Sequence, residues 1–99
     1  MRGILQRSTK IGKKFMVTLF QNDTFRVVHF GAAGMSDYTI HRDKARKAAY
    51  LKRHKPRENW SDPFTAGFWA KHLLWNKPTI SASLSDVQRR FGIKINKKI

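Results

Sequence analysis

Two short runs of apolar residues near the N-terminus predict a pair of β-strands. In residues 14–20 (KFMVTLF) and 24–30 (TFRVVHF), β-branched and aromatic side chains alternate in direction with a period of two. The polar residues between the runs include Asn22 and Asp23, which favour tight turns. The pattern therefore predicts an antiparallel β-hairpin. Both of its faces are substantially apolar, so other elements must cover it.

The segment after the hairpin leaves one alternative open. Gly31 and Gly34 end the second strand and free the backbone to turn. Residues 36–41 (SDYTIH) then fit either a short third strand or a turn that leads into a helix.

Two helices are predicted in the middle of the chain. Residues 43–54 are rich in helix formers and contain no Gly or Pro, and Pro56 ends them. Residues 64–75 follow Asp62-Pro63, a carboxylate at the N-cap and a proline at the first helical position. Apolar side chains nearly surround this second helix, which predicts that it lies at the centre of the core.

A third helix and a short strand are predicted near the C-terminus. Residues 83–86 (SLSD) have the spacing of a capping box, with Asp in place of the usual Glu or Gln. Gly92 fits the C-cap position, and residues 93–95 alternate like an edge strand.

These elements indicate a small single α+β domain spanning residues 15–95. Its N-terminal antiparallel hairpin, of two or three strands, packs on about three helices, and the basic helix 43–54 lies across the surface. Residues 1–14 are polar and basic and are expected to form a flexible or docking arm. Residues 96–99 are expected to form a basic C-terminal tail.

The aromatic residues of the central region can be interpreted in three ways: as a core, as a platform for stacked bases, or as an interfacial membrane helix. They are Trp60, Phe64, Phe68, Trp69 and Trp75. Helical spacing and the small size of the chain favour the core. Trp60 is the expected exception because it lies in a polar loop, and His72 is expected to pack inside the helices.

The excess of positive charge indicates the kind of partner that the protein binds, not its fold. The chain has 21 Lys and Arg against 6 Asp and Glu, a formal net charge of +15 on 99 residues. Residues 41–57 (HRDKARKAAYLKRHKPR) concentrate this charge around a single carboxylate, Asp43. Cations packed this closely repel one another, so an acidic partner is expected: nucleic acid, an anionic membrane face or an acidic protein surface.

Enzymatic function is not expected. The chain has no cysteine, no Gly-rich nucleotide loop and no histidine spacing typical of a metal site, so we predict no catalytic residue, metal, cofactor or small-molecule substrate. His41-Arg42-Asp43 matches the kinase catalytic-loop triplet, but 99 residues cannot hold a two-lobed kinase. The longest apolar segment is interrupted by Lys71 and His72, and no transmembrane segment is predicted.

The basic helix is the candidate binding site for an anionic partner. Its arginines and lysines can neutralise phosphates and release counterions, and arginine also pairs with carboxylates, so nucleic acid and acidic protein both stay open. The candidate residues are Arg42, Lys44, Arg46, Lys47, Tyr50, Lys52, Arg53, Lys55 and Arg57.

The middle of the chain resembles a family of small basic proteins of unknown function encoded by large nucleocytoplasmic DNA viruses of algae and amoebae. The resemblance rests on FGAAGMSDYTIHRD (residues 30–43), RKAAYLKRH (46–54), RENW (57–60), TAGFW (65–69) and LLWNKPT (73–79). It covers roughly residues 30–83.

The resemblance implies a viral protein and a virion location, with host cytoplasm during assembly. The expected function is that of a non-enzymatic minor capsid or cement protein that docks on acidic surfaces of other virion proteins. The alternative is a DNA-binding protein, without sequence preference, associated with the viral genome. The matched polar residues are expected to stabilise a turn rather than to catalyse a reaction; they are Ser36, Asp37, Tyr38, His41 and Asp43.

Overall fold

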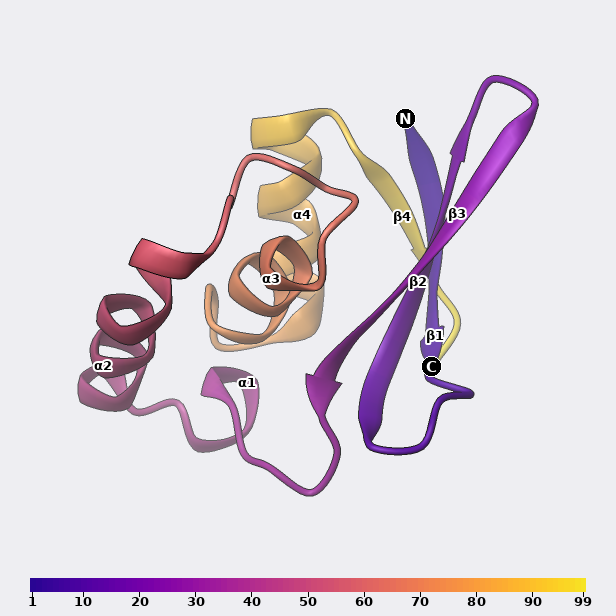
Figure 1. The fold of residues 1–99 in the computed structure, drawn as a ribbon. Helices are drawn as coiled ribbons and strands as arrows, with labels where there is room; N and C mark the ends of the chain where they lie inside the picture. The colour runs from indigo at the N-terminus through magenta and orange to yellow at the C-terminus, as the bar shows by residue number, and fades with distance from the viewer.

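Four strands form one sheet in the computed structural model, which describes residues 1–99 (Figure 1). They are β1 (Arg2–Arg7), β2 (Lys13–Gln21), β3 (Thr24–Ala32) and β4 (Lys94–Lys97), in the order β3-β2-β1-β4. The predicted hairpin is confirmed: β2 and β3 pair antiparallel, with Phe20 opposite Phe25. Asn22 makes the turn in the left-handed conformation, at φ 56°.

The prediction of an N-terminal arm is wrong, because residues 2–7 form an inner strand of the sheet. β1 pairs antiparallel with β2 and parallel with β4. Leu5 is buried, and Gly3 is buried where a Cβ atom would collide with the carbonyl oxygen of Thr18. Residues 2–7 contain only one adjacent apolar pair, so the strand cannot be recognised locally; its second partner comes from the other end of the chain.

The C-terminal tail is likewise shorter than predicted. Asn96 and Lys97 belong to β4, and the Lys98 amide donates a hydrogen bond of 2.8 Å to the Leu5 carbonyl. The predicted edge strand is confirmed, but it spans residues 94–97 instead of 93–95 and runs parallel to β1.

The open alternative at residues 36–41 is resolved as a helix, α1 (Tyr38–His41). The predicted basic helix is confirmed as α2 (Lys44–His54), and a 3-10 turn, η1 (Lys55–Arg57), continues it. Asp43 caps α2 by accepting hydrogen bonds from the amides of Ala45 and Arg46, at 2.9 and 3.2 Å.

The central helix starts later than predicted and changes its winding. It consists of α3 (Ala66–Trp69) followed directly by a π-helical turn, η2 (Ala70–Leu74). Thr65, rather than Asp62, is the N-cap. The Asp62 carboxylate instead accepts a hydrogen bond from the Phe64 amide, and the Pro63 carbonyl accepts one from the Trp69 indole, so this turn stays outside the helix.

The last helix, α4 (Ile80–Phe91), starts one turn before the predicted capping box. Thr79 is its N-cap, and Ser83 is buried, where its hydroxyl accepts a hydrogen bond from the Lys77 amide. Thr79 caps the helix because its hydroxyl accepts a hydrogen bond from the Ala82 amide at 3.1 Å, whereas the Ser83 hydroxyl is already engaged with Lys77. Gly92 is confirmed as the C-cap, at φ 68°.

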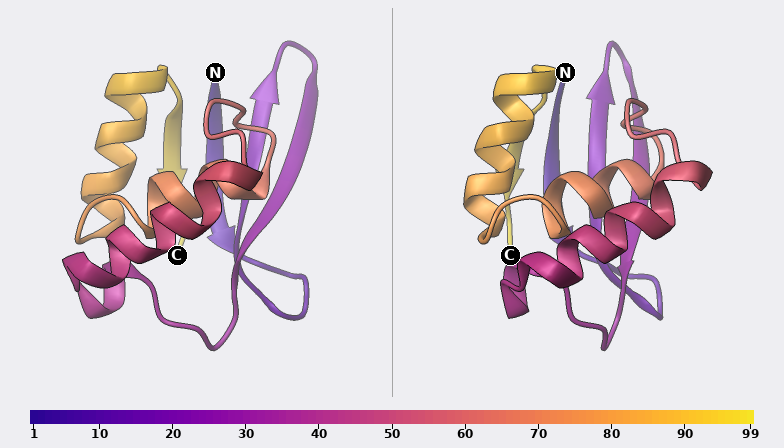
Figure 2. Two further views of the ribbon diagram at one scale, coloured as in Figure 1. Left: turned by 60° about the vertical axis from the view of Figure 1, so that its left-hand side comes forward. Right: turned by 90° about the vertical axis from the view of Figure 1, so that its left-hand side faces the viewer.

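The elements stack in three layers. The helices lie on one face of the sheet, with α3, η2 and α4 against it and α2 outermost (Figures 1 and 2). The α+β class predicted from the sequence is confirmed.

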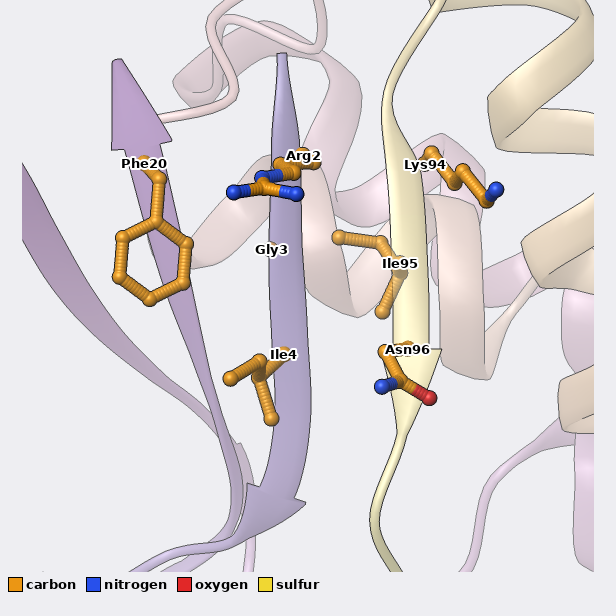
Figure 3. Close-up of a pocket in the computed structure, with 7 residues that line it drawn as sticks. All are labelled: Arg2, Gly3, Ile4, Phe20, Lys94, Ile95 and Asn96. Carbon is orange, nitrogen blue, oxygen red and sulfur yellow. The ribbon is translucent and has the colours of Figure 1, made fainter. Parts of the chain in front are cut away.

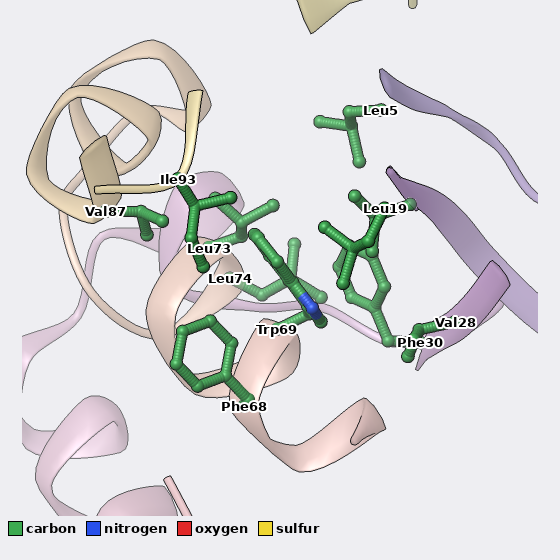
Figure 4. Close-up of a cluster of buried hydrophobic side chains, with 11 residues drawn as sticks. Leu5, Leu19, Val28, Phe30, Phe68, Trp69, Leu73, Leu74, Val87 and Ile93 are labelled. Atoms are coloured by element: carbon green, nitrogen blue, oxygen red, sulfur yellow. The ribbon is translucent and has the colours of Figure 1, made fainter. Parts of the chain in front are cut away.

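The core lies between the sheet and the middle layer (Figure 4). Phe68 and Trp69 have no exposed surface, which confirms that these aromatic residues form the core. Phe64 and Trp75 are half-buried at its border, and Trp60 is half-buried in the loop before α3.

We expect the substitution Trp69→Ala to lower the free energy of unfolding by about 3–5 kcal/mol, because it leaves a large cavity in the core where the Trp69 ring packs on Phe30 of β3. Chemical denaturation of the purified chain measures this change. Ile11→Ala is the matched control: Ile11 is fully exposed, so its loss should alter stability by less than about 0.5 kcal/mol. A Trp69→Ala protein as stable as the control would contradict the central place of Trp69.

Candidate anion-binding surface on α2

Most of α2 faces solvent. Tyr50 is its one buried residue; Lys47, Leu51 and His54 are half-buried beside it, at the spacing of one helical face. The outward side carries exposed cations. We call these the basic face of α2, continued into η1: Lys44, Arg46, Lys52, Arg53, Lys55 and Arg57.

Ring stacking attaches α2 to the rest of the molecule. The Tyr50 ring lies 4.3 Å from the Trp75 ring, with 4° between the planes, and 4.1 Å from the His54 ring. Burial raises the pKa of the Tyr50 hydroxyl far above its ordinary value. Tyr50 was predicted to contact the anionic partner, but in this structure its ring is engaged inside the protein.

A second contact anchors the C-terminal end of α2. Glu58 accepts a hydrogen bond from the Trp60 indole at 2.7 Å, and its other oxygen lies 3.0 Å from Nδ1 of His54. Gly67 lets this carboxylate approach, because a Cβ atom there would lie 2.8 Å from it.

Lys47 is also drawn inward. Its ammonium group donates a hydrogen bond of 2.7 Å to the Asn76 carbonyl and lies 5.0 Å from the centre of the Tyr38 ring. Burial lowers the pKa of Lys47, and the neighbouring ammonium groups of Lys77 and Lys44 lower it further. Lys47 therefore fastens α2 to the turn before α4 instead of facing a partner.

Arg42, which was also predicted to bind the partner, is not part of the basic face. It ends α1 in the left-handed conformation, at φ 54°, and its side chain donates a hydrogen bond of 3.2 Å to the Pro78 carbonyl. Of the nine residues predicted to bind an anionic partner, Arg42, Lys47 and Tyr50 have internal partners, and the other six form the basic face.

Three alanines separate the cations of this face. Ala45, Ala48 and Ala49 are exposed, with Arg46 and Arg53 on one side of them and Lys44 and Lys55 on the other, at 100° per residue. Short side chains between long cationic ones allow a partner to approach the helix backbone closely.

Carboxylates do not neutralise the basic face. Only three of the 21 Lys and Arg form salt bridges with a carboxylate: Lys14, Arg89 and Arg90. Five of the six acids make contacts inside the molecule, and the sixth, Asp23, lies in the β2–β3 turn; the five are Asp37, Asp43, Glu58, Asp62 and Asp86.

The polar residues expected to stabilise a turn organise α1 and the start of α2. Asp37 is buried, caps α1 through the Thr39 amide and binds the Lys14 ammonium at 2.6 Å. The Asp43 amide donates to Nδ1 of His41 at 2.9 Å. The two remaining members, Tyr38 and Ser36, are buried and half-buried beside this turn.

Sequence reasoning missed a polar cluster on α4 that is centred on the buried Asp86. Asp86 accepts hydrogen bonds from Asn76 at 2.8 Å, from Arg90 at 3.1 Å and from Arg89 at 2.5 Å. These hydrogen bonds, led by the one from Asn76, hold the pKa of Asp86 well below its ordinary range although burial opposes them. The i, i+3 and i, i+4 spacing of Asp86 to the arginines was the available signal, and the capping-box interpretation obscured it.

His72 is buried among the rings of Phe68 and Phe91, as predicted. Its Nε2 donates a hydrogen bond of 2.9 Å to the Trp60 carbonyl, and its Nδ1 is buried without a partner. Burial lowers the pKa of His72 to about 4, and the charges of Lys71 and Arg90 act in the same direction.

No group of three or more His, Asp or Glu side chains is placed to hold a metal ion. His41 and Asp43 do lie together, but the Asp43 carboxylate is engaged at the N-terminus of α2. No helix is long and apolar enough to cross a membrane.

A family model described as "Family of unknown function (DUF5754)" matches residues 3–54, more than half of the chain. The chain belongs to this family. The DUF5754 match runs from β1 to the end of α2, so it includes the capped turn and most of the basic face, and it ends before α3. No curated protein and no solved structure matches the chain.

The buried imidazole of this DUF5754 protein gives its stability a pH dependence. The pKa of His72 is about 4 in the folded state, against an ordinary histidine value of 6.5 in the unfolded chain, so the unfolded chain binds more protons between these two pH values. Stability should therefore fall as the pH drops from about 6.5 to about 4, by on the order of 3 kcal/mol.

Denaturant unfolding at a series of pH values measures this loss. His72→Gln is the matched variant, because an amide can still donate to the Trp60 carbonyl but does not titrate. Its unfolding free energy should be nearly flat over the same pH window. An equally steep decline in the variant would place the titrating group elsewhere.

Proposed function

We propose that this protein is a non-enzymatic binding protein that holds nucleic acid, without sequence preference, through the basic face of α2. The observation that carries the proposal is the exposure of Lys44, Arg46, Lys52 and Arg53 on one helix, with no carboxylate paired to any of them. A polyanion supplies the missing negative charge and releases its counterions on binding.

The basic face can contact phosphates throughout but offers little variety for reading bases. All six of its residues are lysine or arginine, which pair bidentately with guanine alone, and none is an Asn or Gln, the residues that pair bidentately with adenine. The exposed alanines let α2 lie close to a backbone or in a groove. Contacts of this kind position a protein on nucleic acid but carry no sequence information.

A second proposal is a minor capsid or cement role in the particle of a large DNA virus, with acidic surfaces of other virion proteins as partners. It is supported by the resemblance to the viral family and by the same unpaired cations, since arginine pairs bidentately with carboxylates. Location in the virion, and in host cytoplasm during assembly, belongs to this proposal. The arms expected for such docking are instead strands β1 and β4, so nucleic acid is the better-supported partner.

We expect the double variant Arg46→Glu/Arg53→Glu to lose most of its affinity for a random-sequence DNA duplex while keeping the wild-type circular dichroism spectrum. Both side chains are exposed, so their replacement changes stability little. Fluorescence anisotropy titrations at several salt concentrations measure the loss. With Arg46→Gln/Arg53→Gln, the slope of log affinity against log salt should decrease by about 2, because each phosphate contact contributes about 0.9.

The matched control is Lys10→Glu/Lys98→Glu, which lowers the net charge equally but lies at exposed positions outside α2. This control should retain duplex affinity. Equal losses in both double variants would show that net charge alone attracts DNA. Binding of an acidic protein or poly-glutamate, but not of DNA, would instead favour the virion-protein partner.

A further inference from the structure

The sheet has a second face that no helix covers. In Figure 1 all helices lie on one side of the strands, and the other side is open. Because side chains alternate along a strand, Leu5, Val17 and Phe30 enter the core while their neighbours point to the open side. That side is apolar for a solvent-facing surface: Phe25, Val27 and Phe20 are 65, 43 and 36% exposed.

On the open face, the strand register places side chains in rows that cross the sheet from strand to strand. Phe25 lies opposite Phe20, Phe20 opposite Arg2, and Arg2 beside Lys94, so two aromatic rings and two cations follow one another across all four strands. The next row contains Val27, Thr18, Ile4 and Asn96 in the same order of strands.

The two phenylalanines form an exposed pair beside a hollow. Their ring centres are 6.5 Å apart, with 47° between the planes. A pocket of about 630 Å³ adjoins Phe20, within the range of ligand-sized pockets. Figure 3 shows Phe20, Arg2 and Ile4 on the same face of the sheet, with Lys94 and Asn96 on the neighbouring strand.

Charge decides between the possible occupants of this face. None of the four strands contains an Asp or a Glu. A second copy of the chain would bring Arg2 and Lys94 against like charges. A partner with flat apolar groups and regularly spaced negative charges fits both the rings and the cations, and unpaired bases on a phosphate backbone have this combination.

We infer that the open face of the sheet binds single-stranded nucleic acid, with bases stacked on Phe20 and Phe25 and phosphates contacted by Arg2 and Lys94. The inference deepens the proposed function, on which it rests for the class of ligand, but it uses a different surface. A duplex cannot use this surface in the same way because its bases are stacked inside the helix. Helix α2 lies on the opposite side of the molecule from the open face of the sheet (Figures 1 and 2), so its exposed cations form a second, separate surface for nucleic acid.

The double variant Phe20→Leu/Phe25→Leu tests the inference, because it keeps apolar side chains on the face and removes the rings. Anisotropy titrations with a fluorescent oligo(dT) and with a DNA duplex, both at physiological salt, should show a loss of about tenfold or more for the single strand and none for the duplex. Ultraviolet cross-linking of the oligo(dT) to the wild-type protein should label peptides of β2 and β3. If the double variant fails to fold, Phe25→Leu alone serves, since Phe25 is the more exposed ring.

Met35→Ala is the matched control, because Met35 is 64% exposed but lies in the loop before α1. It should leave both affinities unchanged. Unchanged single-strand binding in the phenylalanine variant, or an equal loss with Met35→Ala, would overturn the inference. So would a loss of self-association in the phenylalanine variant without a change in oligo(dT) binding, which would identify the face as a dimer contact.

The Arg46→Glu/Arg53→Glu variant separates this inference from the proposed function. If the duplex binds through α2 but the rings do not matter for oligo(dT), the inference alone fails. If oligo(dT) binds through the rings but charge reversal on α2 has no effect, the proposed role of α2 fails and the inference stands. If neither ligand binds, both are rejected.

Discussion

Mutual repulsion among 21 lysines and arginines is the constraint to which the rest of the structure conforms. Six carboxylates are too few to neutralise the surface. Most of them lie where they cap or anchor elements of the fold. Asp37 and Asp43 cap helices, Glu58 anchors the end of α2, and Asp86 is buried under three hydrogen-bond donors. Cohesion then comes from an apolar core, and most of the cations lie on the outside, where they repel one another least.

This arrangement explains why the basic helix can be both exposed and fixed. α2 contributes one buried residue, yet stacked rings, the inward Lys47 and the His54–Glu58 contact hold it against the middle layer. A helix held by its inner side chains keeps its outer cations in constant geometry without using any of them for folding. A partner that binds them therefore need not compete with the fold.

The two uncovered surfaces differ in chemistry and lie on opposite sides of the molecule. The outer side of α2 carries cations and alanines, which suits a phosphate backbone; the open side of the sheet carries aromatic rings beside Arg2 and Lys94, which suits unpaired bases. Under the two proposals together, one chain would bring two nucleic-acid segments together, or hold one segment where it passes from paired to unpaired.

The sequence by itself determined the features that depend on neighbouring residues. The β2–β3 hairpin, the capped helix α2, the burial of Phe68 and Trp69, and the excess of positive charge all follow from local periodicity, turn residues and composition. Only the tertiary structure decided what depends on distant segments. Residues 2–7 become an inner strand because β4, some ninety residues later, pairs with them. Tyr50 and Lys47 turn inward because the Trp75 ring and the Asn76 carbonyl lie against the inner side of α2. The row of Phe25, Phe20, Arg2 and Lys94 arises in the same way, because strand register joins four strands that no sequence window contains together.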